Sequence, residues 1–267
     1  MEFPDKKRRE IDGVDILFLF WIMLVALVWI GPAIQDHVGK AKAFVTESML
    51  LIGVVGYLRF RRLPIRELCR WNLVPLQVVP YFILFAVSGS VLLDGLDRLV
   101  GLVIPMPAET AESYRLELGA STVLEKFLVV LGIGLAAPIV EETIFRGVIQ
   151  STFERRSDVT KGIMLTALIF GLIHFQIAWL IQILIMSVFL GWMAWQWKSI
   201  IPAVILHAAN NTLTYFIMFD ANESFEAIYL VQGQLNPIIA LISGAIAYYA
   251  FIKMVSAYRR INITITD

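Results

Sequence analysis

The stretch Pro138-Ile139-Val140-Glu141-Glu142-Thr143-Ile144-Phe145-Arg146 places three charged side chains near the end of a long apolar segment. A charge inside a lipid bilayer is costly, so it persists there only when it is paired, and usually because it has a function. We therefore expect this stretch to hold both an internal ion pair and a group that does chemistry.

The composition indicates a membrane protein that crosses the bilayer several times. Of the 267 residues, 58% are hydrophobic and 16% are charged, and the apolar residues form blocks long enough to span a hydrocarbon core. The formal net charge is zero, and we expect no nucleic-acid partner. Cys69 is the only cysteine, which excludes an internal disulfide and a cysteine-based metal cluster. The expected fold class is an all-α, polytopic helical bundle.

The apolar blocks predict about eight transmembrane helices. They cover residues 14–34, 43–58, 74–93, 121–149, two short spans within 162–197, 200–219 and 237–257. The first block is longer than a signal peptide's apolar region and is predicted to be retained. The run 162–197 would reach about 54 Å as one helix, whereas a hydrocarbon core is about 30 Å thick, so we expect a reversal near residues 176–180.

These helices divide one integrated membrane domain into three sections. Residues 1–120 form helices one to three with a loop, 121–219 form a core of helices four to seven, and 220–267 form the last helix and tail. Residues 94–120 predict a loop with a short interfacial helix, and a lid over a site is the alternative.

Charge along the chain predicts the orientation. Alternating the sides of eight spans places 16 of the 22 Lys and Arg residues, including Lys6 to Arg9, on the side of both termini. Five fall on the other side: Lys40, Lys42, Arg98, Arg115 and Lys126. The positive-inside rule then predicts that both termini are cytoplasmic.

Within the opening stretch, the two glutamates have different expected roles. Glu141 and Glu142 point roughly 100° apart on a helix, so both cannot aim at one substrate atom. Glu142 and Arg146 are four residues apart in the favourable order, which predicts an ion pair between them. Glu141 is then the free carboxylate, suited to act as the general base for a water molecule.

Three further polar side chains lie in apolar spans at compatible depth. His174 is on span five, and His207 and Asn211 share one face of span seven. The provisional span ends place them and Glu141 about 10 to 20 Å from the cytoplasmic boundary. His174 could orient or activate the water, while His207 and Asn211 could donate hydrogen bonds to an oxyanion.

The structural alternative has to be weighed for each residue. One membrane-embedded His or Asn more often joins helices than catalyses, but a carboxylate, two histidines and an amide on three spans at compatible depth favour function. Phe170 is expected to be core or pocket wall, and Glu47 is expected to be interfacial. Close helix packing is predicted at the small residues Gly132, Gly134, Ala136, Ala137 and Gly171.

At these residues the chain resembles the CPBP family, the CAAX proteases and bacteriocin-processing enzymes also called the Abi family. The three family motifs occur in order, as Glu141-Glu142…Arg146, Phe170…His174 and His207…Asn211. The resemblance implies an intramembrane endopeptidase of the prokaryotic inner membrane whose active site opens toward the cytoplasm. By the same resemblance, Glu141 and His174 activate water, and His207 and Asn211 stabilise the tetrahedral intermediate.

Two questions stay open at this point. Glu141, His174 and His207 could instead hold Zn²⁺, but the chain lacks a His-Glu-x-x-His motif, and we favour a glutamate-dependent reaction without a cofactor. The expected partners are the lipid bilayer and a membrane-associated protein or peptide substrate. A proton-relaying transporter and a non-catalytic, immunity-type protein are the alternatives.

Overall fold

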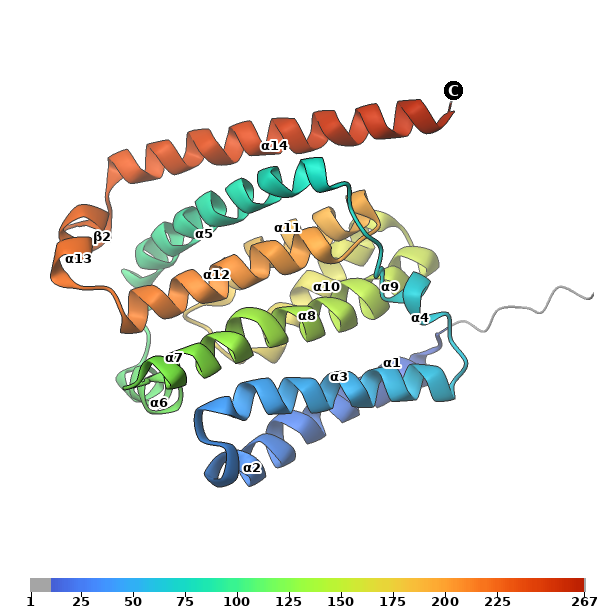
Figure 1. Ribbon diagram of the computed structural model, residues 1–267, viewed down its shortest axis with the longest axis horizontal. Coiled ribbons are helices and arrows are strands. Elements are labelled where there is room, and N and C mark those ends of the chain that lie inside the picture. Colours follow the sequence, from blue (N-terminus) through green and yellow to red (C-terminus); the bar gives the residue numbers. More distant parts are fainter. Residues whose placement is uncertain (1–10, 267) are drawn as a thin grey trace, which may run out of the picture.

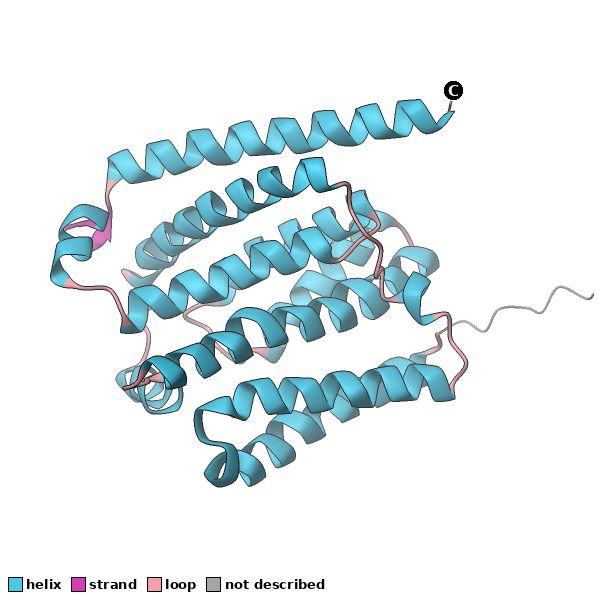
Figure 2. Ribbon diagram, in the orientation of Figure 1, coloured by secondary structure: helices cyan, strands magenta, loops and turns pink. Residues whose placement is uncertain are grey.

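The computed structural model describes residues 11–266 and is almost entirely helical (Figures 1 and 2). The described residues contain a single hairpin of two short strands, β1 (Leu230–Val231) and β2 (Gln234–Leu235). The prediction of an all-α membrane bundle is confirmed. The N-terminal basic cluster at residues 6–9 lies outside the described residues.

Eight long helical segments run back and forth along the bundle in Figure 1. The first is α1 (Gly13–Val25), η1 (Ala26–Ile30) and α2 (Gly31–Val38); the second is α3 (Lys42–Phe60), and the third is α5 (Val79–Gly101). The fourth joins α7 (Val123–Val129), η4 (Val130–Ala136), α8 (Ala137–Glu142), η5 (Thr143–Ile149) and α9 (Gln150–Arg156). The remaining four are α10 (Val159–Ile173), α11 (Leu180–Trp197), α12 (Ile201–Phe219) and α14 (Pro237–Thr266).

Short elements fill the connections between these segments. They are η2 (Gly39–Ala41), α4 (Ile65–Leu68), η3 (Leu76–Val78), α6 (Ala108–Leu118) and α13 (Glu223–Tyr229). In Figure 1, α14 packs against α5, α5 against α12, and the hairpin of α1 and α3 closes the other side of the bundle.

By length and composition, five segments of the described chain are able to cross a membrane. They are Gly13–Phe60, Leu76–Gly101, Val123–Arg156, Leu180–Trp197 and Pro237–Ile261. The first of them contains two of the eight segments, because the chain turns at Gly39, where φ is +52°. α10 is shorter, with 15 residues, and α12 contains His207 and two asparagines. The predicted reversal within 162–197 is confirmed between α10 and α11.

Several predicted boundaries were wrong. The third helix begins at Val79 rather than residue 74, because Pro75 holds an extended backbone before it and Pro80 occupies its first turn. It continues to Gly101, so Asp94 and Asp97 are helical rather than part of a loop. The short helix predicted between 94 and 120 exists as α6. The fourth and eighth helices extend past their predicted ends, to Arg156 and Thr266.

The two ends of the bundle differ in charge. We call the end that contains residues 61–78, 157–158 and 198–200 the basic face. Its described Lys and Arg residues are Arg59, Arg61, Arg62, Arg66, Arg70, Arg155, Arg156, Lys161, Lys198, Lys253, Arg259 and Arg260. Its acidic residues are Asp12, Asp15, Glu67, Glu154 and Asp158.

We call the opposite end, which contains residues 39–41, 102–122, 174–179 and 220–236, the acidic face. Its Lys and Arg residues are the five that the sequence assigned to this side. Its acidic residues are Asp36, Asp94, Asp97, Glu109, Glu112, Glu117, Glu125, Asp220, Glu223 and Glu226. The charge asymmetry predicted from the sequence is therefore also present in the fold.

Glycines let α3 and α11 approach the central helices, as predicted. A Cβ on Gly132 would lie 2.7 Å from the Ala43 Cβ and 2.8 Å from the Phe44 backbone nitrogen. A Cβ on Gly171 would lie 2.9 Å from a methyl group of Leu184. The contact at Gly132 sets α3 directly against η4, one turn from the residues that line the site.

Candidate active site

Glu141 and Glu142 lie at the end of α8, between the π-helical segments η4 and η5. π-Helical turns are rare and often occur at functional sites. The Glu142 side chain is completely buried, whereas 21% of the Glu141 side chain is exposed. The two carboxylates therefore occupy different environments, as the helical geometry predicted.

Glu142 is part of a buried network of charged and polar groups. Its Oε1 accepts a hydrogen bond from Arg146 Nη1 at 2.9 Å, and both side chains are 0% exposed. Arg146 Nη2 also donates to Ser187 Oγ at 2.7 Å. The same Glu142 Oε1 lies 2.9 Å from Nδ1 of His207. The predicted Glu142–Arg146 ion pair is present. The same Glu142 carboxylate also holds the Nδ1 edge of the His207 ring.

Phe170 is buried between three of these groups. The Arg146 guanidinium carbon lies 4.3 Å from the centre of the Phe170 ring, which gives a cation–π contact. The His174 and His207 rings lie 4.6 and 5.8 Å from the same ring, centre to centre. Phe170 thus contacts both imidazoles from the core, which is one of the two positions expected for it.

His174 is held through Nδ1, which lies 2.6 Å from the Phe170 carbonyl oxygen. A carbonyl oxygen can only accept a hydrogen bond, so Nδ1 carries a proton and donates it. In the neutral ring Nε2 is then unprotonated and able to accept a hydrogen bond from water. The backbone of α10 therefore selects the tautomer that a base or a water-orienting group needs.

Asn211 is anchored by a defect in the facing helix. Its Nδ2 donates to the Ile133 carbonyl oxygen at 2.9 Å. In η4 the Ala137 N–H bonds to the Gly132 carbonyl, five residues earlier. In the same pattern, the nitrogen of Pro138 would be the donor to the Ile133 carbonyl. Proline has no N–H, and the Ile133 carbonyl is left free for Asn211. The second N–H of the Asn211 amide is not used by this bond.

A cavity of about 530 Å³ brings the predicted site residues together. Glu141, His174, His207 and Asn211 all line it, although they come from three helical segments. His207 Nε2 lies 3.9 Å from Glu141 Oε2, beyond hydrogen-bond distance. Glu142, Arg146 and Phe170 stay behind the wall, where they support the lining residues.

Glu47 lines the cavity, a position that the sequence did not predict for it. Its side chain is buried, with the residue only 8% exposed, and it lines the same cavity as Glu141. The two carboxylates interact electrostatically, and Glu47 Oε2 has no hydrogen-bond partner. A carboxylate within a mostly apolar span was part of the signal that singled out Glu141, and the same signal was present at Glu47.

The outer part of the cavity contains further polar groups that the sequence assigned to a loop. Asp97 and Arg98 of α5 line it, together with Tyr114 of α6 and Trp179. The rings of Tyr114 and Trp179 lie 4.9 Å apart. Burial, followed by the nearby Glu117 carboxylate, raises the pKa of Tyr114. The Tyr114 hydroxyl therefore remains protonated at neutral pH and can act as a donor.

The fit to a metal ion can be tested on the same geometry. Among residues 11–266, no group of three or more His, Cys, Asp or Glu side chains is placed to hold a metal ion. His207 directs Nδ1 to Glu142, which leaves Nε2 as its one nitrogen on the side of Glu141. Glu141, His174 and His207 share the cavity without forming a ligand cluster.

A carboxylate, two imidazoles and an amide thus line one cavity of the helical membrane bundle. Residues 123–213 match the Rce1-like family model, described as type II CAAX prenyl endopeptidase Rce1-like. The match covers all three motifs and confirms the predicted family resemblance. It supports a CAAX-type intramembrane protease in general, and with the apolar helices it supports an integral membrane protein. No curated protein and no solved structure gives a significant match.

Proposed function

We propose that this protein is an intramembrane endopeptidase that uses Glu141 and His174 to activate water against a peptide bond of a membrane-associated substrate. The observation that carries the proposal is the position of Glu141. Its carboxylate has no hydrogen-bond partner at Oε2, is partly exposed, and lines one cavity with His174, His207 and Asn211. Burying an unpartnered carboxylate lowers stability, and such groups are typical of functional sites.

The proposed reaction begins with a water molecule between Glu141 and Nε2 of His174. Glu141 accepts a proton from the water as the water oxygen bonds to the carbonyl carbon. The carbonyl oxygen becomes an oxyanion, which the free N–H of Asn211 stabilises. Glu141 then returns the proton to the amide nitrogen, the C–N bond breaks, and the amine product leaves.

His207 needs a particular protonation state to act as a second oxyanion donor. Its Nδ1 lies against the Glu142 carboxylate, so Nδ1 carries a proton. For Nε2 to donate as well, the ring must be an imidazolium, with the Glu142 carboxylate on its Nδ1 side and the Glu141 carboxylate on its Nε2 side. In this proposal Glu142 and Arg146 position His207 and do not touch the substrate.

The proposal includes a reaction without a metal, and zinc held by Glu141, His174 and His207 is the alternative. The absence of a ligand cluster in the described residues favours the metal-free form. Purified protein should keep its activity in the presence of a chelator. If a chelator abolishes the activity and stoichiometric zinc restores it, the nucleophile would be a zinc-bound water, and the metal-free reaction would be wrong.

The function can be tested without knowing the substrate. Membrane proteomes of cells with the wild-type chain and with Glu141→Ala are compared for precursor proteins that stay uncut. Glu109→Ala, which removes an exposed carboxylate on α6, is the matched control and should resemble the wild type. The substrate's lipidation is read from the precursors themselves. Identical processing in the wild type and Glu141→Ala would contradict the proposal and favour a carrier or a binding protein.

A further inference from the structure

The cavity extends from the site in one direction only. On α12 its lining includes His207, Asn211, Thr214 and Met218, which follow one another on one helix face toward the C-terminal end of the helix. The distance from His207 to Phe219, which also lines the cavity, is about 18 Å along the axis. α12 ends at the acidic face, so the cavity runs from the site to that face.

The other helices agree with this direction. α5 contributes Asp94 and Asp97, which lie near its end at the acidic face, and α3 contributes Ala43 and Glu47, which lie near its start there. Tyr114 belongs to α6, a helix that lies wholly at this face. The rim of the cavity is therefore formed by elements of the acidic face.

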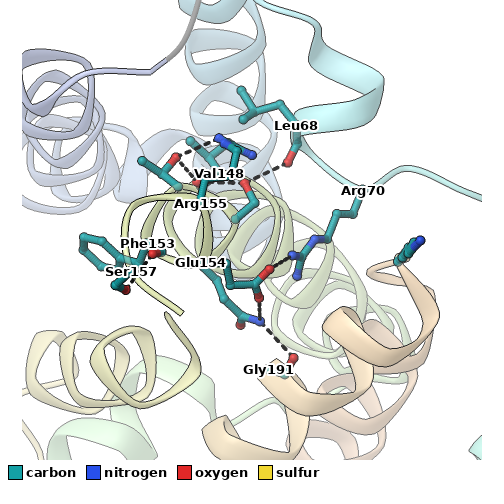
Figure 3. A network of polar contacts seen from close by, with 12 residues as sticks. Leu68, Arg70, Val148, Phe153, Glu154, Arg155, Ser157 and Gly191 are labelled. Carbon is teal, nitrogen blue, oxygen red and sulfur yellow. Dashed lines mark hydrogen bonds and ion pairs between the residues drawn. The ribbon is translucent and has the colours of Figure 1, made fainter. Parts of the chain in front are cut away.

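The opposite direction is closed. All eleven residues from Glu142 to Thr152 are buried, and they follow Glu141 directly along the chain. Within this run, Gln150 donates to both Glu154 and the Gly191 carbonyl, and Glu154 is paired with Arg70. Figure 3 shows this polar network joining α9, α11 and the loop after α4. We call residues 142–154 with Arg70 and Gly191 the polar plug.

The polar plug lies on the side of the basic face. That face has twelve described Lys and Arg side chains against five acidic ones, and the acidic face has five against ten. Positively charged segments are retained on the cytoplasmic side during membrane insertion. The closed end of the bundle is thus the end that should face the cytoplasm.

From these observations we infer that the catalytic cavity is entered from the non-cytoplasmic side of the membrane. The inference rests on the proposed function and specifies its substrate class: peptide segments exposed on, or inserted from, the outer side. The sequence predicted cytoplasmic termini, and the family resemblance implied an active site that opens toward the cytoplasm. Both cannot hold, because the cavity opens at the acidic face, opposite the end that holds the basic residues. The Lys and Arg residues of this chain place the closed end in the cytoplasm, so the cavity opens on the other side.

The test is the accessibility of single cysteines in the full-length chain. Cys69 is fully buried and is replaced by alanine, which removes the only native thiol. Three cysteines are then introduced one at a time: Thr214→Cys within the cavity, Val103→Cys on the acidic face and Leu73→Cys on the basic face. Val103 and Leu73 are 82% and 89% exposed, so they report orientation alone.

A small, membrane-impermeant methanethiosulfonate reagent is added to spheroplasts and, separately, to inverted membrane vesicles. We expect Val103→Cys and Thr214→Cys to be modified in spheroplasts and protected in inverted vesicles, and Leu73→Cys to show the reverse. Modified Thr214→Cys should also lose proteolysis, while modified Leu73→Cys keeps it. Modification of Thr214→Cys from the same side as Leu73→Cys, or from neither side, would overturn the inference.

The accessibility result is independent of catalysis, which separates the two proposals. If the labelling pattern is as expected but Glu141→Ala cells still process every precursor, the entry side stands and the enzyme function fails. If Glu141→Ala stops processing but the labelling pattern is reversed, the function stands and the entry side fails.

Discussion

The polar plug and the cavity are neighbours in the chain and in space, yet they use charge in opposite ways. In the plug, Glu142 and Arg146 are fully buried and bonded to each other. In the cavity, Glu141 and Glu47 both line the wall, and Oε2 of each carboxylate has no hydrogen-bond partner. Adjacent glutamates on one helix thus differ because Glu142 is fully buried and hydrogen-bonded, whereas Glu141 is partly exposed in the cavity without a hydrogen bond at Oε2.

Because of this difference, we expect the Glu142–Arg146 pair to affect stability and Glu141 to affect catalysis. A buried pair contributes little net stability over apolar residues, but removing one partner leaves an uncompensated charge. An unpartnered carboxylate in a hydrated cavity can be removed at little structural cost. Variants on the two sides of the boundary between Glu141 and Glu142 should therefore fail in different ways.

The largest expected effect is on catalysis at Glu141. Glu141→Gln keeps the shape of the side chain but removes the base, so we expect hydrolysis to fall by about 10²- to 10⁴-fold. The unfolding midpoint of the purified protein should stay close to that of the wild type, because Glu141 Oε2 makes no hydrogen bond that the change could break. A large drop in the midpoint would mean that the roles of Glu141 and Glu142 are reversed.

The next effect is on stability in the plug. Arg146→Met leaves Glu142 buried without its cation, and we expect the free energy of unfolding to fall by about 3–5 kcal/mol. The matched control is Arg115→Met, which breaks the exposed Arg115–Glu112 pair and should cost under about 1 kcal/mol. Thermal unfolding in detergent measures both, and equal losses would argue against a special role for the plug.

Asn211 lies on the cavity side and should affect turnover. Asn211→Ala removes an oxyanion donor, so kcat is expected to fall by about 10²- to 10³-fold while KM changes little. Steady-state kinetics on an identified precursor peptide separate the two constants. A rise in KM at constant kcat would instead assign Asn211 to substrate binding.

Glu47 should show a trade between stability and activity. Glu47→Leu removes a buried carboxylate oxygen that has no partner, and we expect the free energy of unfolding to rise by about 1 kcal/mol. Hydrolysis should fall, because the carboxylate lies in the cavity beside Glu141. Higher stability with unchanged hydrolysis would make Glu47 part of the wall only.

The smallest effect is expected at Pro138. Pro138→Ala supplies an N–H that can bond to the Ile133 carbonyl and compete with Asn211, a change of about 1 kcal/mol or roughly fivefold in kcat. In an Asn211→Ala background the same change should have no further effect, because there is no amide left to displace. An equal loss in both backgrounds would show that Pro138 acts through the helix and not through Asn211.

Sequence reasoning found the features that depend on one helix. The Glu142–Arg146 pair follows from a spacing of four residues, and the divergence of Glu141 from Glu142 follows from helix geometry. Proline moved the start of α5 by five residues, since Pro75 stays outside the helix that residue 74 was expected to begin. The position of Glu47 in the cavity was not predicted, because α8 and η4, which pack against α3, lie more than eighty residues further along the chain.

The sequence alone determined the class of protein, the eight helical segments, the charge asymmetry and the residues of the three motifs, since apolar length, helix period and charge are local properties. Only the tertiary structure decided that Glu142 holds His207, that Asn211 reaches the carbonyl left free by Pro138, and that Glu47 faces Glu141. It also decided which end of the cavity is closed. These features depend on the depth and rotation at which separate helices pack, and the spacing of residues along the chain does not specify either.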